Sequence, residues 1–503
     1  MSFADLAANL AVGFSVALSW QNLLYCLLGS LLGTLIGVLP GIGPVTTIAM
    51  LLPITFKLEP TSALIMLAGI YYGSQYGGST TAILVNLPGE ASSIVTTLDG
   101  YQMARQGRAG QALAVAALGS FFAGCVGTLL IAAAGPPLAA VAQQFGPAEY
   151  FSLMALGLVA SIVMASGSVL KAFAMIFVGL MLGLVGTDVD TGAFRYTFGI
   201  GELSDGISFV AVAMGLFGIA EILRNLEGGS EQRDVLGTRV TGLWPDLAAL
   251  KRAAPAVLRG TGLGAVLGLL PGGGAVLASF ASYTLEKKIA KDPSRFGKGA
   301  IEGVAGPESA NNAGAQTSFI PMLTLGIPSN AVMALMVGAM IIQGVQPGPE
   351  VMTKRPDLFW GMVASMWVGN LMLVVINLPM IGLWVSLLRV PYRLMYPAIL
   401  LFCCIGVYTL NNSTFEVLLA AGFGLFGYAL LKLGFEPTPL LLGFVLGPLM
   451  EENLRRTMRY AQGDPMVFVE RPLSAGLLAV AALLLAVILL PVIRRKREDV
   501  FVE

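Results

Sequence analysis

The feature of this sequence that could carry chemistry is a glycine-proline pattern that occurs twice, 231 residues apart. The first copy reads GTLIGVLPGIG at 33–43, and the second reads GAVLGLLPGGG at 264–274. Proline followed by closely spaced glycines cannot continue a regular helix. Free N–H groups at such a break, beside a helix N-terminus, bind carboxylate or phosphate without a lysine. The breaks are therefore candidate substrate-binding tips, made of Pro40, Gly41, Ile42 and Gly43 in the first copy and Pro271, Gly272, Gly273 and Gly274 in the second.

Each tip is followed by a run of small polar residues and then by a second proline break. These runs offer hydroxyl, amide and unhindered backbone groups to a substrate. The candidates in the first half are Ser74, Gly77, Gly78, Ser79, Thr80, Asn86, Pro88 and Gly89. Those in the second half are Ser309, Asn311, Asn312, Thr324, Pro328 and Ser329. Because the apolar stretches contain hardly any lysine or arginine, we expect these groups, and not a salt bridge from Lys171 or Arg195, to hold an anionic substrate.

Two glutamates, Glu90 and Glu308, lie next to the predicted breaks. Each carboxylate either neutralises the charge of a helix N-terminus or takes part in binding a coupling ion, and both interpretations stay open. Carbonyl groups freed at the breaks are suited to Na⁺. The sequence contains no histidine, so proton coupling would depend on one of these glutamates. We favour Na⁺ over H⁺, and we expect neither a cofactor nor a metal centre.

The same residues also have structural interpretations. Glycines four residues apart, as in Gly33/Gly37 and Gly264/Gly268, are typical of closely packed membrane helices. The polar runs resemble hydrogen-bonding faces between helices. The duplication of the proline break favours a binding site, because paired broken segments in two halves of a chain indicate the substrate site of a transporter.

Composition limits the class of protein that can position these residues. Of the 503 residues, 56% are hydrophobic and 12% are charged, whereas soluble domains carry about 25% charged residues. The sequence therefore predicts an all-α polytopic membrane protein with roughly 10–12 membrane segments, at about 20 residues per segment. Zero net charge gives no reason to expect a nucleic-acid partner. The absence of histidine and of a Walker A sequence excludes a Ser-His hydrolase and a P-loop ATPase, so we do not expect an enzyme.

The chain divides into two related halves. Residues 1–224 form the first membrane repeat, 225–259 form a cytoplasmic connector whose surface helix starts near Trp244, and 260–503 form the second repeat with extra C-terminal transmembrane helices. Basic residues flank the second tip on both sides but not the first, which favours inverted repeats with re-entrant or broken helices. The basic run RRKR at 494–497 predicts a cytoplasmic C-terminus. The N-terminus lacks the basic region of a secretory signal.

These motifs resemble a known family. The pattern at 33–43, together with YGGS at 76–79 and NLPG at 86–89, is similar to the large membrane subunit of the tripartite tricarboxylate transporters, the TctA family. So are PESANNA at 307–313 and IPMLTLGIP at 320–328, and the likeness covers nearly the whole chain. The sequence departs from the family pattern at Ser329, where glycine is usual, and near Gln316 and Thr317.

The resemblance implies a multi-pass protein of the bacterial inner membrane. It implies partners as well, namely a small membrane subunit and a periplasmic solute-binding protein. Together these would import a tricarboxylate-like substrate by symport with an ion. An alternative function is an ion or metabolite channel lined by the same broken helices. An intramembrane protease is disfavoured, because no Gly-x-Gly-Asp motif lies in an apolar segment.

Overall fold

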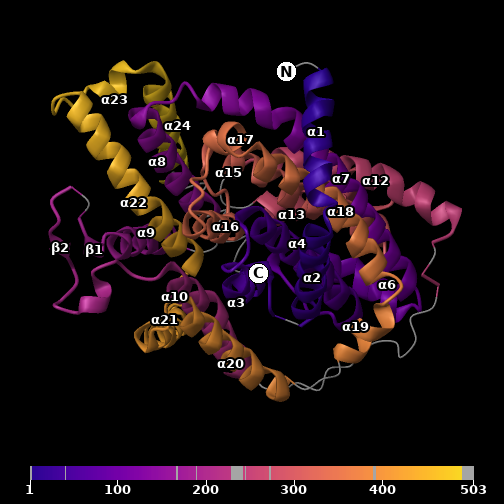
Figure 1. The fold of residues 1–503 in the computed structure, drawn as a ribbon. Coiled ribbons are helices and arrows are strands. Elements are labelled where there is room, and N and C mark those ends of the chain that lie inside the picture. The colour runs from indigo at the N-terminus through magenta and orange to yellow at the C-terminus, as the bar shows by residue number, and fades with distance from the viewer. Residues whose placement is uncertain are drawn as a thin grey trace.

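The computed structural model describes residues 3–39, 41–165, 168–188, 190–227, 242–243, 245–270, 274–388 and 392–489. Within these ranges the chain is an assembly of helices with one small hairpin of two strands (Figure 1). Of the predicted tip residues, Pro40, Pro271, Gly272 and Gly273 lie outside the described residues, as do much of the predicted connector and the basic C-terminal run. The all-α polytopic class predicted from the sequence is confirmed.

The first half contains eleven of the described α-helices. They are α1 (Phe3–Ala17), α2 (Trp20–Gly37), α3 (Pro44–Thr55), α4 (Pro60–Val85), α5 (Ile94–Thr96), α6 (Gln102–Arg105), α7 (Ala109–Ala142), α8 (Pro147–Met164), α9 (Val169–Gly183), α10 (Phe209–Ala213) and α11 (Ala220–Glu227). Short helical turns join them, namely η1 (Ala91–Ser93), η2 (Thr97–Tyr101), η3 (Gly201–Leu203) and η4 (Met214–Ile219). Strands β1 (Gly186–Thr187) and β2 (Phe194–Arg195) pair antiparallel between α9 and η3.

The second half begins in a helix that crosses the predicted boundary at 259/260. Its described helices are α12 (Leu247–Leu267), α13 (Gly274–Ile289), α14 (Glu302–Thr317), α15 (Phe319–Leu325), α16 (Ala331–Ile342), α17 (Glu350–Lys354), α18 (Pro356–Asn377), α19 (Ile381–Leu387), α20 (Tyr392–Asn411), α21 (Thr414–Lys432), α22 (Pro437–Tyr460), α23 (Val467–Glu470) and α24 (Pro472–Leu489), with the turn η5 (Pro293–Arg295). Asp246 caps α12 by accepting a bond of 2.7 Å from the Ala249 N–H. The apolar run at 358–388 forms two helices, α18 and α19.

Five helices in the described ranges are long and apolar enough to cross a membrane. They span Trp20–Gly37, Ala109–Ala142, Phe209–Glu227, Pro356–Asn377 and Thr414–Lys432. Seven shorter apolar helices of 10–17 residues accompany them within the same described ranges. Short apolar helices beside full spans are expected where the chain breaks inside the bilayer and is covered by protein.

The repeated glycines of α2 and α12 lie against the backbones of α4 and α14. A Cβ placed on Gly29, Gly33 or Gly37 would come within 2.4 Å of a carbonyl oxygen of α4, at Met66, Ile70 and Ser74 respectively. On Gly260, Gly264 or Gly268 it would come within 2.4 Å of a carbonyl oxygen of α14, at Gly306, Ala310 and Gly314. The packing interpretation of the two glycine patterns is therefore confirmed, since only glycine permits this approach.

These contacts align the two halves residue by residue. Met66, Ile70 and Ser74 correspond to Gly306, Ala310 and Gly314, an offset of 240 residues. The same offset pairs Asn86 with Gly326, which end α4 and α15 in the left-handed region at φ +59° and +74°. The two proline breaks at 88 and 328 follow at the same offset. The halves thus share one helix-packing scheme, while their opposite orientation in the bilayer stays a prediction.

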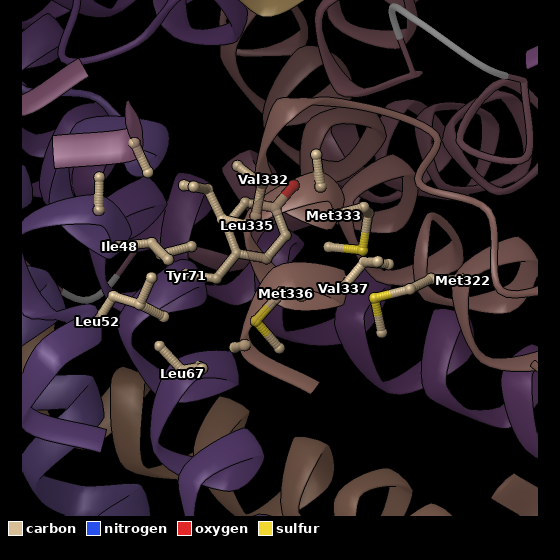
Figure 2. Packing of buried hydrophobic residues seen from close by; sticks show 14 of the residues in the cluster. Ile48, Leu52, Leu67, Tyr71, Met322, Val332, Met333, Leu335, Met336 and Val337 are labelled. Carbon is tan, nitrogen blue, oxygen red and sulfur yellow. The ribbon is translucent and has the colours of Figure 1, made fainter. Parts of the chain in front are cut away.

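The apolar core is continuous between the two halves. Figure 2 shows side chains of α3 and α4 meeting those of α15 and α16, and the contacts of α16 with α3 and α4 agree with this view. The labelled residues, all buried, are Ile48, Leu52, Leu67 and Tyr71 from the first half and Met322, Val332, Met333, Leu335, Met336 and Val337 from the second. The two halves therefore share one apolar core.

Candidate functional site

Glu308 lies in α14 but is bound by the first half. Its side chain is buried, with 1% exposed. Its carboxylate accepts a hydrogen bond of 2.6 Å from the hydroxyl of Ser79 on α4 and another from the hydroxyl of Thr96 on α5. A buried carboxylate is tolerated where such donors satisfy it. Glu308 therefore connects the second half to two elements of the first.

Glu90 makes the reverse connection. It follows the break of the first half and caps η1, where its N–H donates to the Ser93 hydroxyl at 3.3 Å. Its carboxylate accepts a bond of 2.9 Å from the side-chain amide of Asn311 on α14. Each half thus contributes one carboxylate that is hydrogen-bonded by the other half.

The described parts of the two glycine-proline tips border this region. A Cβ on Gly43 would lie 3.5 Å from the Gly89 carbonyl oxygen and 3.7 Å from Glu90 Cβ. A Cβ on Gly314, one turn along α14 from Asn311, would lie 3.3 Å from the nitrogen of Ala275, which follows Gly274. A chain of contacts therefore runs from the first tip through Glu90 and Asn311 to the second tip.

Asn312 and Ser120 extend this polar region into α7. The Asn312 amide donates to the Ser120 hydroxyl at 2.7 Å and to the Glu308 carbonyl oxygen at 3.1 Å. We call the connected residues the central polar cluster, which comprises Ser79, Glu90, Thr96, Ser120, Glu308, Asn311 and Asn312. The cluster thus draws on four helices and one turn, from both halves.

A small cavity opens beside the cluster. It has a volume of about 20 Å³ and is bordered by Ser79, Thr80, Ser120, Glu308 and Asn377. That is room for one water molecule or a bare cation. The Oδ1 atom of Asn377, which borders this cavity, is buried without a hydrogen-bond partner among the described residues. Buried acceptors without partners are costly, so a ligand that offers a donor or a positive charge would stabilise them.

No lysine or arginine binds either glutamate of the cluster in the part of the chain that the structure describes. Lys171 donates instead to the Leu433 carbonyl oxygen at 2.6 Å and lies over the ring of Phe435. Arg195 pairs with Glu451 at 2.7 Å and with Asp188 at 3.4 Å. Both cations are engaged away from the cluster.

Other predicted site residues make local contacts. Four hydroxyls donate to a carbonyl oxygen of their own helix, those of Ser74, Thr80, Ser309 and Thr324. Ser329, beside the buried Pro328, donates to the Ser318 carbonyl oxygen at 3.3 Å, within the second half. Asn86 is exposed, and Pro88 is half-buried. None of these hydroxyl hydrogen bonds links one half to the other.

Five predicted residues near the first tip have contacts of their own. Gly77 and Gly78 allow close approach, since a Cβ on Gly77 would lie 2.6 Å from the Val38 nitrogen and one on Gly89 would lie 2.3 Å from Gly78 Cα. Gly41 has φ +82°, and a Cβ at this position would lie 2.9 Å from Oδ1 of Asn225 on α11. Ile42 is buried in the core, with 1% exposed.

Sequence reasoning missed Thr96, Ser120 and Asp99. Thr96 belongs to the polar run that follows Glu90, a signal that was present in the sequence. Ser120 is a single hydroxyl in an apolar segment and gives no such signal. Asp99 is fully buried and accepts bonds of 2.7 Å from the N–H groups of both Gly299 and Ala300. This further contact between the halves depends on the fold, because it joins residues two hundred positions apart.

Comparisons with known proteins fit this architecture. Residues 23–442 match the tripartite tricarboxylate transporter TctA family. The chain is 62% identical over 499 residues, 99% of each chain, to an Agrobacterium vitis protein described as an uncharacterized 52.8 kDa protein in the TAR-I ttuC' 3' region. It is 61% identical over 240 residues to a second protein of that organism, described as uncharacterized in the TAR-II ttuC' 3' region; the match covers 48% of this chain and 99% of the relative. No solved structure matches it. Because the family match covers most of the chain, and because the first relative is 62% identical over 99% of each chain, this chain belongs to the tripartite tricarboxylate transporter TctA family.

Proposed function

We propose that this protein is the membrane subunit that carries the substrate path of a binding-protein-dependent secondary transporter, and that its substrate is a carboxylate. The observation that carries the proposal is the reciprocal bonding of Glu90 and Glu308 across the two halves. The tips beside them offer backbone N–H groups to the substrate carboxylate. Family membership and the scarcity of basic side chains at the cluster support the same assignment.

The glutamates are suited to coupling because each one holds the halves together. Binding of a cation beside Glu308 competes with the Ser79 and Thr96 hydroxyls for the same carboxylate oxygens. A change of charge there alters how firmly α14 is attached to α4 and α5. A ligand can shift a conformational equilibrium only through such differential contacts. We favour Na⁺, which would use the carboxylate, hydroxyl and freed carbonyl oxygens, over H⁺, which would titrate a glutamate.

The proposed assembly includes a small membrane subunit and a periplasmic solute-binding protein, in a bacterial inner membrane with the C-terminus in the cytoplasm. The binding protein would select the substrate, so this chain need only recognise a carboxylate. A tricarboxylate-like substrate is the proposal that follows from family membership.

The test is uptake into proteoliposomes that contain this chain and its small partner, with the binding protein outside. An imposed Na⁺ gradient at fixed pH is compared with a pH gradient in Na⁺-free buffer, using radiolabelled citrate as the first probe. We expect accumulation above the external concentration under the Na⁺ gradient, and its loss when an ionophore dissipates that gradient. Flux that only equilibrates the two sides would favour the channel alternative.

A second comparison locates the coupling site. Glu308→Gln should abolish the dependence on the ion gradient, while Glu350→Gln, an exposed residue paired with Lys354, should behave as the wild type. Full accumulation by Glu308→Gln would contradict the role proposed for this carboxylate. Full accumulation under the pH gradient alone would show that H⁺, and not Na⁺, is the coupling ion.

A further inference from the structure

A second cavity, away from the central polar cluster, is lined by positive charge. It has a volume of about 350 Å³ and contains four cationic side chains from three segments, namely Arg108 before α7, Arg252 on α12, and Arg295 and Lys298 around η5. Ser294, Gly299, Ala300 and Ile301 complete its lining. The proposed transport mechanism uses none of these residues.

The wall of this cavity is held in place by both halves. The N–H groups of Gly299 and Ala300 are fixed by the buried Asp99 carboxylate at 2.7 Å each. Arg108 donates to the Gly299 carbonyl oxygen at 2.8 Å, and Gln106 donates to the Lys298 carbonyl oxygen at 2.8 Å. The segment at 298–300 is therefore organised before any ligand arrives, which lowers the entropy cost of binding.

The cations in the cavity are incompletely neutralised. Arg295 pairs with Glu302 at 3.2 Å, and Arg108 bonds only uncharged oxygens, those of Gln106 and Gly299. Arg252 and Lys298 form no ion pair within 4 Å among the residues that the structure describes, and Asp292 interacts with Arg295 and Lys298 only through longer-range attraction. Like charges that converge on one cavity repel each other, and a multivalent anion removes that repulsion.

The helix that carries Arg252 also presents apolar side chains outward. Leu247 and Leu258 of α12 are 67% and 60% exposed, on either side of Lys251 and Arg252 in the sequence. A helix that mixes exposed leucines with basic residues is typical of a membrane-water interface. Lys287 and Lys288 on the neighbouring α13, and Lys291 just after it, favour a cytoplasmic position for this face.

We propose that this cavity binds a phosphate group, and the exposed leucines of α12 favour an anionic phospholipid as its carrier. Guanidinium forks from Arg108, Arg252 and Arg295 match the geometry of phosphate oxygens, and Lys298 adds a point charge. The site is separate from the proposed carboxylate path, so the proposal of phosphate binding does not depend on the proposed transport function.

The experiment measures lipid binding to the purified full chain by native mass spectrometry. The probes are phosphatidylglycerol, phosphatidylcholine and inorganic phosphate, each added to delipidated protein in detergent. We expect phosphatidylglycerol to bind, and the double variant Arg252→Gln/Lys298→Gln to weaken it by about tenfold or more. The matched control is Lys287→Gln/Lys288→Gln, which removes two cations from the same face without touching the cavity and should bind as the wild type does.

The outcomes distinguish the source of the phosphate. In one outcome, inorganic phosphate binds and is weakened by the same variants, while phosphatidylglycerol is not preferred over phosphatidylcholine. That outcome would support the site but show that its ligand is a free anion. Equal weakening by the control, or no binding of either phosphate probe, would overturn the proposal. The single variants Arg252→Gln and Arg252→Lys, with melting temperatures for each, separate loss of binding from loss of folding: the lysine variant should restore part of the affinity.

Discussion

The two halves of this protein repeat their scaffold but not their chemistry. At an offset of 240 residues, the residues of α4 and α14 that the glycines approach, the left-handed ends at Asn86 and Gly326, and the prolines at 88 and 328 coincide. The residues equivalent to Glu308, Asn311 and Asn312 are Ala68, Tyr71 and Tyr72, which belong to the apolar core. The position of Glu90 is taken in the second half by Asn330, which caps α16.

This difference shows how one repeated arrangement of helices can carry two different sets of side chains. The backbone geometry of a break depends on a few glycines and prolines, and duplication copies it intact. Side chains on the faces of α4 and α14 are free to diverge, provided that the buried polar ones keep partners. Here the divergence places one carboxylate on each half and its donors on the other.

The strongest test of the repeated scaffold is to fill the glycine contacts. Gly33→Val and Gly264→Val should each destabilise the fold by at least about 3 kcal/mol, because the new Cβ would sit 2.3 Å and 2.2 Å from a backbone oxygen that cannot move aside. Membrane abundance and the melting temperature in detergent measure this. Gly262→Val is the control, because nothing lies within 4 Å of its Cβ position. If valine is tolerated at Gly33 or at Gly264, the two halves do not share the same requirement for close helix packing.

The asymmetric chemistry predicts that both glutamates matter although neither has a counterpart in the repeat. Glu308→Gln and Glu90→Gln should lower uptake about tenfold or more when compared at equal membrane abundance, because each removes a charge that we propose takes part in ion coupling. Asn330→Ala should lower stability by about 1 kcal/mol through loss of a helix cap, with uptake retained. Uptake by Glu90→Gln equal to that of the wild type would leave Glu308 as the sole functional carboxylate.

The first tip offers a finer comparison, between two of its own glycines. Gly41 has φ +82°, whereas Gly43 is extended at φ −76° and has its nearest neighbour at 3.5 Å. Gly41→Ala should therefore cost about 1–2 kcal/mol and impair uptake, while Gly43→Ala should be tolerated. Thermal unfolding and proteoliposome uptake report the two effects. Equal tolerance at both positions would show that the tip does not need its left-handed turn.

The smallest effect is expected at the hairpin, which has no equivalent at the 240-residue offset. Hydrogen bonds from Arg455 and from the Thr191 N–H hold the pKa of Asp188 well below its usual range. The stabilisation is therefore complete above about pH 4, the pKa of the unfolded chain, and is lost only as the pH falls toward the folded value. Asp188→Asn should lower the melting temperature by a degree or two at pH 7, and the difference should shrink below about pH 4. A difference that grows on acidification would contradict this sign.

The sequence was sufficient for those features that depend on local backbone chemistry. The glycine packing, the breaks after Asn86 and Gly326, and the all-helical membrane class follow from residue type and spacing, and each was predicted. Ser79 and Asn311 of the central polar cluster were predicted as site residues, but Thr96 and Ser120 were not, because they reach the cluster only through the packing of α5 and α7 on α14. The ion pairs of Asp188 and Asp190 with Arg455 were also missed, because each of the two segments is polar and predicts a solvent-exposed loop when its sequence is considered alone.

The glycine contacts have a consequence for motion. Helices α2 and α4 mesh backbone to backbone, as do α12 and α14, so each pair should move as a rigid body. Among the described residues, no backbone-to-backbone hydrogen bond links the first half to the second. Where these two helix pairs meet, at the central polar cluster, they are joined by hydrogen bonds of side chains, which can exchange partners through a rotamer change. A transport cycle would therefore move the two helix pairs relative to each other at this interface, and the hydrogen bonds of the two carboxylates would hold the interface together.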